Sequence, residues 1–304
     1  MKIDNYVVEK LRGTWIHYVF KKLWDLKRRV MRRSEGEAIL LQLYFERHGK
    51  SLNVTNPQKF TEKLFCRMIA LNRRRHPTFT QLADKYTARD YAGSKVGGEH
   101  LIKLLWNGKD PRAIPFDTLP AKYVIKTNHG SGQVIVVKGQ ADRIDIVGKL
   151  SVWLKTNYYW YHREYHYYHI KPKVLIEEFL EGPDGSIPLD YKFWCFNGIP
   201  AVIQVANTTR DINPFFDTQW NQLDLYTREG VPRPAIAKPR NLEQMLSIAS
   251  RLSEGFDFVR IDLYNLYGKI YFGEFTFTPT AGLMNPPESW DLKLGEKWVM
   301  QSET

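Results

Sequence analysis

Two apolar runs near the carboxyl end of the chain, residues 257–264 and 269–277, restrict its fold more than any other feature. They flank a glycine-containing turn at 267–268, and such an arrangement predicts an antiparallel hairpin. Side chains two residues apart on a strand share a face, so Arg260 and Asp262 are expected to point the same way. The hairpin is therefore expected to carry charged side chains on one face.

The second strand of this hairpin carries Glu274 and Thr276, which also share a face. Pairing the strands brings Asp262 close to Glu274, and two facing carboxylates repel each other unless a cation lies between them. Carboxylate oxygens and water suit Mg²⁺, and Arg260 beside them could stabilise a phosphoryl group in transfer. The pattern predicts a metal site, although an ordinary surface cluster of these charges explains it equally well.

A lysine and a glycine-rich turn stand in the middle of the chain. Lys126 ends an apolar strand, and His129-Gly130-Ser131-Gly132 leads into a returning strand at 133–138. A lysine at a strand end can meet phosphate oxygens, and glycines let backbone N–H groups approach them closely. His129 could contact phosphate, act as an acid or base, or cap the turn. Taken alone, the segment is better interpreted as a plain hairpin turn.

An acidic strand end follows at 174–180. There Glu177-Glu178-Phe179-Leu180 precede Asp184. The backbone of such a strand end could bind an adenine edge, and a carboxylate could bind ribose hydroxyls. An ordinary strand with a solvated acidic end remains the favoured interpretation of this segment in isolation.

Two further cations occupy the stretch between these motifs. Lys192 begins another strand, and Arg210 follows the strand that returns from it. Each is typical of a surface charge, but together with Lys126 they could surround a polyphosphate.

The remaining segments predict an α+β fold, because helices and strands occur without strict alternation. A strand pair is expected within 191–207 around Asn197-Gly198, and Asn107-Gly108 is typical of a loop. Apolar periodicity predicts helices at 35–48, 59–73, 78–93, 142–157 and 241–254.

Positive charge is concentrated at the amino end of this 304-residue chain, whose net charge is +11. Residues 1–33 contain ten Lys or Arg and three acids, a local net charge of +7. Apolar residues at three- and four-residue steps predict a basic amphipathic helix at 7–31. Such a helix can lie on an anionic membrane or pack against the rest of the protein, and the two fit nearly equally well. Nothing downstream supports nucleic-acid binding.

The sequence lacks the usual signs of secretion or membrane insertion. Its two cysteines, Cys66 and Cys195, argue against a disulfide framework and a cysteine-based zinc site. No run approaches ~20 apolar residues, and the amino end lacks the pattern of a signal peptide. We expect a cytoplasmic protein whose basic helix offers contact with the inner face of a membrane.

Tyrosine and histidine are dense at 158–169, where His162, His166 and His169 recur at four- and three-residue steps. Three interpretations stay open: a helix end packed near the glycine turn, a stacking surface for a sugar, and a metal site. The packed helix end is the favoured one.

The order of these motifs resembles that of ATP-grasp enzymes such as D-alanine–D-alanine ligase and glutathione-synthetase-like ligases. It runs from a lysine strand with a glycine hairpin through Glu-Glu-Phe-Leu, Asp-x-Lys and Arg-x-Asp to Glu-x-Thr. More specifically, the chain resembles the TupA-like ATP-grasp family over roughly residues 56–300. The stretches that carry this resemblance include 83–86, 126–133, 157–160, 190–198, 260–264, 273–279 and 290–295.

The resemblance implies an ATP-grasp fold that uses ATP and Mg²⁺. Residues 34–115 would form a helical N-terminal subdomain after the basic helix of 1–33. Residues 116–188 would form the lid, and 189–304 a C-terminal mixed-sheet subdomain with the Mg²⁺ site.

The resemblance also implies roles by position. Lys126 would hold the ATP phosphates under a mobile turn at 130–132, and His129 lies beside that turn. Glu177-Glu178-Phe179-Leu180 would form the adenine hinge, and Asp184 would reach the ribose. Lys192 lies where glutathione-synthetase-like ligases carry an arginine.

For the metal, the resemblance implies that Asp262 and Glu274 bridge Mg²⁺. Thr276 takes the place of the usual asparagine ligand, as it does in the TupA-like pattern itself. The charge in transfer would be stabilised by four cations: Arg260, Lys126, Lys192 and Arg210.

The implied reaction is ATP-dependent joining of a carboxylate to an amine through an acyl phosphate. The family's association with cell-surface polysaccharides implies a saccharide or uronic acid as one substrate and an amine or amino acid as the other. The alternatives are a glycosyltransferase that uses a nucleotide sugar, a sugar kinase on an ATP-grasp fold, and a membrane-bound scaffold that binds ATP without turnover.

Overall fold

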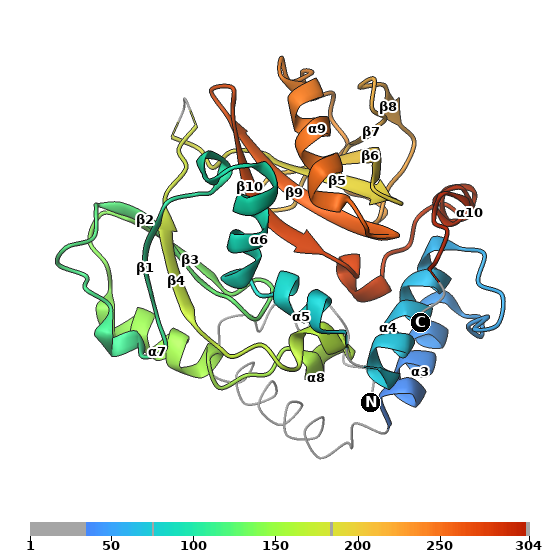
Figure 1. Ribbon diagram of the computed structural model, residues 1–304, viewed down its shortest axis with the longest axis horizontal. Coiled ribbons are helices and arrows are strands. Elements are labelled where there is room, and N and C mark those ends of the chain that lie inside the picture. Colours follow the sequence, from blue (N-terminus) through green and yellow to red (C-terminus); the bar gives the residue numbers. More distant parts are fainter. Residues whose placement is uncertain (1–34, 75, 183–184, 302–304) are drawn as a thin grey trace.

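The computed structural model describes residues 35–74, 76–182 and 185–301, which form two antiparallel sheets with helices around them (Figure 1). The smaller sheet has the order β1-β4-β2-β3 and the larger one β10-β9-β5-β6-β7-β8. The strands are β1 (Leu104–Gly108), β2 (Lys122–Thr127), β3 (Val134–Lys138), β4 (Val174–Glu178), β5 (Asp190–Phe196), β6 (Ile199–Ala206), β7 (Phe215–Phe216), β8 (Gln222–Leu223), β9 (Phe258–Leu266) and β10 (Lys269–Thr276). The helices are α3 (Gly36–His48), α4 (Phe60–Arg73), α5 (Pro77–Ala83), α6 (Thr87–Val96), α7 (Arg143–Trp153), α8 (Tyr159–His162), α9 (Leu242–Ser253) and α10 (Glu288–Lys297). This arrangement confirms the predicted α+β class.

The turn residues explain the hairpins of the large sheet. Asn197 and Gly198 join β5 to β6 with φ of 51° and 78°, and Tyr267 and Gly268 join β9 to β10 with φ of 53° and 83°. Two consecutive residues with positive φ form a turn whose twist matches that of the paired strands. Glycine at the second position avoids a Cβ clash there. Both hairpins lie where the sequence predicts them.

One face of the large sheet is apolar and carries the main core. Phe193 of β5 and Ile261 of β9 are fully buried on this face, and α9 and α6 pack against it. Because side chains alternate along a strand, Lys192 and Asp262 point to the opposite face. That face is where the polar residues of the sheet gather.

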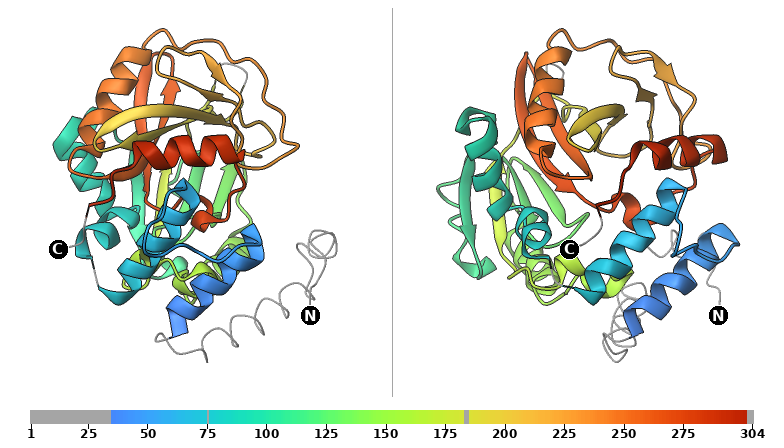
Figure 2. Two further views of the ribbon diagram at one scale, coloured as in Figure 1. Left: turned by 90° about the vertical axis from the view of Figure 1, so that its right-hand side faces the viewer. Right: turned by 45° about the vertical axis from the view of Figure 1, so that its right-hand side comes forward.

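Among residues 35–74, 76–182 and 185–301, helices cover one end of the polar face. There Phe60 of α4 packs against Trp194, Phe258 and Trp298, with ring centroids 5.2, 4.9 and 5.5 Å away. Figure 2 shows α4 between α3 and α10, which contact it from two sides. The other end of the face, at Lys192, is turned toward the small sheet.

The small sheet is covered on its outer face by α7. Ile146 and Leu150 of this helix pack against Ile125 and Ile176 of the sheet, and all four side chains are buried. Alternation then turns the neighbouring Lys126 toward the inner face, which faces the large sheet. The two sheets thus present polar residues to each other.

The prediction of one continuous helix at 78–93 is wrong, because the structure has two helices there. α5 and α6 are separated by Asp84-Lys85-Tyr86, and the Asp84 carboxylate accepts hydrogen bonds from the Tyr86 N–H at 2.8 Å and from Asn128 at 2.9 Å. This polar side chain competes with the helical hydrogen bonds and ends α5. The break directs Lys85 toward the glycine-rich turn.

Strand β1 was not predicted, because Asn107-Gly108 is typical of a loop. The strand lies at the edge of the small sheet and exists through its pairing with β4, with an irregular register between Leu104 and Trp106. The segment 34–115 therefore contributes a strand as well as helices. An edge strand of this kind carries a weak local signal.

Further sequence predictions concern the basic helix, Asp184, the two cysteines and membrane-spanning segments. The basic helix predicted at 7–31 lies outside the described residues, as does Asp184. Cys66 is half-buried, Cys195 is buried, and both are free thiols. Within the described chain, no helix has the length and apolar character needed to cross a membrane.

Candidate functional site

A cavity of about 410 Å³ lies between the two sheets. Residues from both sheets line it, so it depends on their mutual placement. The lining includes most of the predicted site: Lys126, Gly130, Ser131, Gly132, Glu177, Glu178, Phe179, Leu180, Lys192, Arg210, Asp262 and Glu274. We call it the nucleotide cavity, because the sequence predicts that these residues bind a nucleotide.

On the small-sheet side, Lys126 is fixed by a buried carboxylate. Its Nζ lies 2.6 Å from Oε2 of Glu177, and Nη1 of Arg89 lies 2.9 Å from Oε1 of the same group. β2 and β4 are neighbours, and Leu175 lies opposite Lys126, so the pair spans adjacent strands. Two cations around one carboxylate give this group of three residues a net positive charge. Arg89 is a site residue that the sequence interpretation missed.

The glycine-rich turn closes the wall next to Lys126. Gly132 has a φ of 73°, which favours glycine, whereas a Cβ on Gly130 would lie 2.7 Å from the end of the flexible Gln133 side chain. The Gly130 carbonyl accepts a hydrogen bond from Lys85 Nζ at 3.0 Å. The two glycines of the turn thus present backbone without side chains to the cavity, on either side of Ser131.

His129 does not take part in this wall, contrary to the prediction that it contacts the cofactor. Its ring is buried, and Nε2 lies 3.2 and 3.0 Å from the carbonyls of Trp153 and Thr156 at the end of α7. Burial lowers the pKa of the imidazole. His129 therefore anchors the turn to α7, which is the capping alternative left open by the sequence.

Phe179 and Leu180 follow β4 and are nearly buried at the edge of the nucleotide cavity. Glu178 is exposed, and its backbone N–H donates to the Lys103 carbonyl at 2.9 Å. The segment therefore offers apolar side chains at the edge of the cavity, of the kind that line sites for flat heteroaromatic rings.

On the large-sheet side, Lys192 and Asp262 form the centre of a charged network. Lys192 Nζ lies 2.7 Å from Asp262 Oδ2 and also contacts Asp190. Arg260 binds both oxygens of Asp262, through Nε and Nη2, at 2.6 Å. β5 and β9 pair with Lys192 opposite Asp262, which brings these groups together.

Glu274 faces Asp262 because of a β-bulge. Phe272 and Phe275 both belong to the apolar core although they are three residues apart, and the register shifts between Phe272 and Glu274. Without the bulge, Glu274 would share the buried face of Phe272. A Cβ on Gly273 would lie 3.0 Å from the Asp262 carbonyl, so glycine suits the bulge.

The Glu274 carboxylate is held by cations. Lys85 Nζ lies 3.0 Å and Arg260 Nη2 3.7 Å away. Burial opposes its ionisation, but the charges of Lys85, Arg260 and Lys192 outweigh burial and hold its pKa well below the usual range. Glu274 is therefore ionised at neutral pH.

Two predicted metal ligands, Asp262 and Glu274, lie opposite each other as expected, with Cα positions in register. The hydroxyl of Thr276 instead accepts a hydrogen bond from Arg260 Nη2 at 3.0 Å, so it is engaged by the arginine. In the described part of the chain, no group of three or more His, Cys, Asp or Glu is arranged to hold a metal. A Mg²⁺ here would have two carboxylate ligands and take the others from phosphate and water, which suits this ion.

Asp190 is a second residue that the sequence interpretation did not assign to the site. Its Oδ1 is buried without a hydrogen-bond partner and the residue lines the nucleotide cavity. Burial and the charge of Asp262 raise its pKa to about 6, against the opposing effect of Lys192. An unsatisfied buried oxygen in this position fits a site that takes up a further cation or donor.

A second cavity of about 300 Å³ adjoins the first and shares Ser131, Lys192, Arg210 and Glu274 with it. We call it the substrate cavity. Its other walls carry polar side chains from α3, the 158–169 segment and the loops after β8 and β10. His166 of the histidine cluster is buried, and burial lowers its pKa to about 3.

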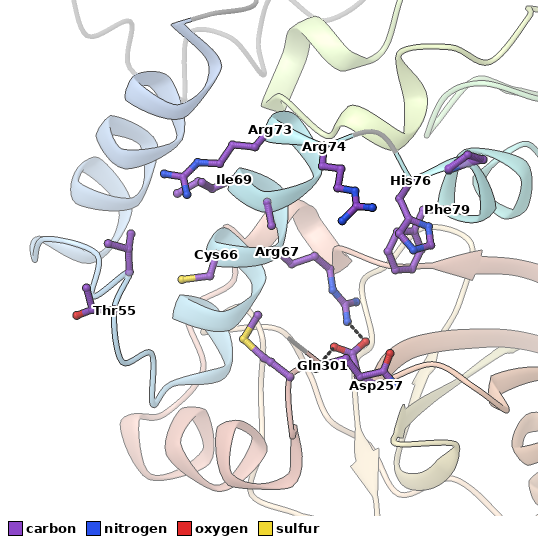
Figure 3. A pocket seen from close by; sticks show the side chains of 14 residues that line it. Thr55, Cys66, Arg67, Ile69, Arg73, Arg74, His76, Phe79, Asp257 and Gln301 are labelled. Atoms are coloured by element: carbon purple, nitrogen blue, oxygen red, sulfur yellow. Dashed lines mark hydrogen bonds and ion pairs between the residues drawn. The ribbon is translucent and has the colours of Figure 1, made fainter. Parts of the chain in front are cut away.

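A third cavity, of about 680 Å³, lies elsewhere, between α4 and the residues that follow α10 (Figure 3). Its most buried charge, Arg67, is already paired with Asp257. That pair belongs to the framework, so this cavity is not the candidate site.

Comparison with known proteins identifies the family. The model of the TupA-like ATPgrasp family matches residues 62–299, more than half of the chain. A comparison with curated proteins gave no match.

Solved structures with a similar fold include D-alanine–D-alanine ligases. That of Bacillus anthracis, complexed with ATP, has 13% identity and a TM-score of 0.43 over 72% of this chain and 64% of its own. That of Helicobacter pylori has 18% identity and a TM-score of 0.44 over 72% of this chain and 61% of its own. The ATP-grasp ligase PsnB with minimal precursor, Mg and ADP has 11% identity and a TM-score of 0.37 over 72% and 59%. The chain thus spans less than two thirds of each of these ligases, and its family model places it in the TupA-like ATP-grasp family.

Proposed function

We propose that the protein is an ATP- and Mg²⁺-dependent ligase that joins a carboxylate to an amine through an acyl phosphate. One observation carries the proposal: cations of both sheets and the facing carboxylates of Asp262 and Glu274 line one cavity. Cations alone would suit many anions. Cations combined with an oxygen pair for Mg²⁺ suit a nucleoside triphosphate.

The residues that line the cavity would bind different parts of Mg²⁺-ATP. Lys126 and the backbone of the glycine-rich turn would bind the phosphates, and Phe179 would pack against the adenine. Asp262 and Glu274 would hold Mg²⁺, which neutralises phosphate charge when it is bound. The turn would exclude water from the reacting groups, as lids do in other transfer enzymes.

The first test is binding. Mg²⁺-ATP is expected to raise the melting temperature, because a ligand that binds only the folded state stabilises it by about 2.7 kcal/mol at a hundred times its Kd. UDP- and GDP-sugars with Mg²⁺ are the matched comparison, measured by the same thermal scan. Stabilisation by a nucleotide sugar but not by ATP would replace this proposal with a glycosyltransferase.

The proposal also names the class of each substrate. We expect a uronic acid as the carboxylate and an amino acid or other amine as its partner, in cell-surface polysaccharide biosynthesis. Acids can be screened with hydroxylamine, which traps acyl phosphates as coloured hydroxamates. A sugar kinase would make ADP and a phosphosugar without hydroxamate.

Membrane contact through residues 7–31 remains a prediction from the sequence. Replacing Lys21, Lys22, Lys27 and Arg28 by glutamine is expected to abolish co-sedimentation with phosphatidylserine vesicles. Each basic residue near an anionic surface contributes about 1 kcal/mol. Pure phosphatidylcholine vesicles are the control, and equal co-sedimentation of both proteins with the anionic vesicles would exclude this contact.

A further inference from the structure

The substrate cavity contains a buried carboxylate that the proposed roles leave unused. Glu164 lines this cavity and is 5% exposed. Its Oε1 accepts a hydrogen bond from the hydroxyl of Thr278, and among the described residues this is its hydrogen-bond partner. A carboxylate with one neutral donor is poorly satisfied for a buried acid, which can accept several hydrogen bonds.

The groups packed around Glu164 supply no compensating charge. The closest basic group is Nε2 of His166 at 4.0 Å, and burial together with the charge of Arg67 keeps that ring neutral. Tyr158 and Tyr167 also feel the Glu164 charge, and burial raises the pKa of both phenols, so they stay neutral as well. Burial raises the pKa of the Glu164 carboxyl to about 7. Glu164 therefore changes charge around neutral pH, in a cavity that His162 also lines.

Glu164 lies outside the nucleotide cavity. The two cavities share Ser131, Lys192, Arg210 and Glu274, whereas Glu164 and Thr278 line only the substrate cavity, as do the cations Arg47, Arg228 and Arg260. An ammonium group is attracted to a buried carboxylate, while a carboxylate substrate is repelled by it. The part of the substrate cavity around Glu164 is thus suited to the amine. The part shared with the nucleotide cavity, where Lys192 and Arg210 lie, is suited to the acid.

Building on the proposed ligase activity, we propose that the substrate cavity binds the amine substrate and that Glu164 accepts the proton from its ammonium group. The carboxylate takes one proton from R–NH₃⁺ and becomes a carboxylic acid. The nitrogen lone pair then forms the C–N bond to the acyl carbon. The C–O bond to phosphate breaks, its electrons leave with the phosphate, and the remaining excess N–H proton goes to that phosphate.

The full-length protein and Glu164→Gln provide the test, with two nucleophiles and the acid found in the hydroxamate screen. Glutamine can still accept the Thr278 hydrogen bond, so the wall is preserved. Hydroxylamine is largely unprotonated at neutral pH and needs no base. Ammonium chloride is the smallest protonated amine, and its product is the primary carboxamide.

We expect both proteins to form hydroxamate at similar rates, whereas carboxamide formation at pH 7.5 falls about a hundredfold in Glu164→Gln, as is typical when a general base is lost. In the wild type, carboxamide formation rises as Glu164 ionises and levels off above its pKa. In the variant it keeps rising about tenfold per pH unit, because only free ammonia reacts.

Two outcomes would overturn the role of Glu164. One is equal carboxamide formation by both proteins with the same pH profile, and the other is a wild type that forms hydroxamate but no carboxamide. Failure of the wild type to form hydroxamate with any acid would instead count against the ligase proposal itself. A structural role for Glu164 would lower both products together and leave the pH profiles parallel.

Discussion

Glu274→Gln is expected to lower ATP-dependent turnover by a hundredfold or more while changing the melting temperature by only a few degrees. The substitution removes the charge of one proposed Mg²⁺ ligand, and loss of one electrostatic contact to a transferring group typically costs about 10²–10³ in rate. The side chain is 35% exposed, and its partner Lys85 keeps the Gly130 carbonyl as an acceptor. The fold therefore loses little.

Asp262→Asn is a poorer test of the same site. Asp262 is 2% exposed and is the shared partner of Lys192 and Arg260. Removing its charge leaves Lys192 with only Asp190 and Arg260 with only Glu274 as described carboxylate partners, and weakening such a buried network costs up to about 3–5 kcal/mol. Lost activity in this variant would combine lost chemistry with lost stability.

The two variants should be compared by turnover, thermal melting and Mg²⁺-ATP titration. For Glu274→Gln we expect retained melting and a weaker response to Mg²⁺. Near-normal turnover in this variant would contradict the metal assignment. Glu181→Gln is a control for loss of one acidic charge, because Glu181 follows β4, is absent from the lining of the nucleotide cavity and pairs with the exposed Lys122.

Local sequence patterns predicted much of this architecture. The hairpins at 197–198 and 267–268 were predicted because turn chemistry is local, and strand pairing predicted that Asp262 and Glu274 face each other. The bulge at Gly273 was not predicted. The bulge matters because simple alternation from Phe272 would place Glu274 on the buried face of the sheet. With the bulge, Glu274 lies on the polar face.

Long-range contacts account for what the sequence interpretation missed. Arg89 and Lys85 lie beside a helix break, and their roles appear only when β4 and β10 bring Glu177 and Glu274 to them. His129 carried a functional interpretation because of its neighbours, yet its ring turns toward the end of α7. The residues around such a histidine do not show whether its ring points toward the cavity or toward the end of α7.

Arg67→Met is expected to destabilise the protein by about 3–5 kcal/mol and to lower the melting temperature by roughly 5–10 °C. Arg67 is 3% exposed on α4, where Nη2 pairs with Asp257 and Nη1 donates to the carbonyls of Phe258 and Phe277 at 2.8 and 3.1 Å. The guanidinium also lies over the Trp298 ring, 4.2 Å from its centroid. Figure 3 shows the pair from the adjoining cavity.

The cost arises mainly from Asp257, whose carboxylate would stay buried without its cation. It would retain hydrogen bonds from the Trp298 indole at 2.9 Å and from its neighbour's backbone N–H at 2.8 Å. These donors are neutral and cannot replace a charge. The double variant Arg67→Met/Asp257→Asn should therefore recover part of the loss, which a double-mutant cycle would measure.

Arg73→Met is the matched control, because it lies on the same helix and also forms an ion pair. Its partner Glu37 is 2.6 Å away, but both side chains are exposed, so the pair should contribute under about 1 kcal/mol. Equal melting of the two single variants would show that α4 is not held through Arg67.

The loss of stability expected for Arg67→Met has a consequence for the site, since Phe277 follows directly after β10. By fixing that carbonyl, Arg67 holds the end of the strand that carries Glu274, so Arg67→Met should also weaken Mg²⁺-ATP binding although it touches neither ligand.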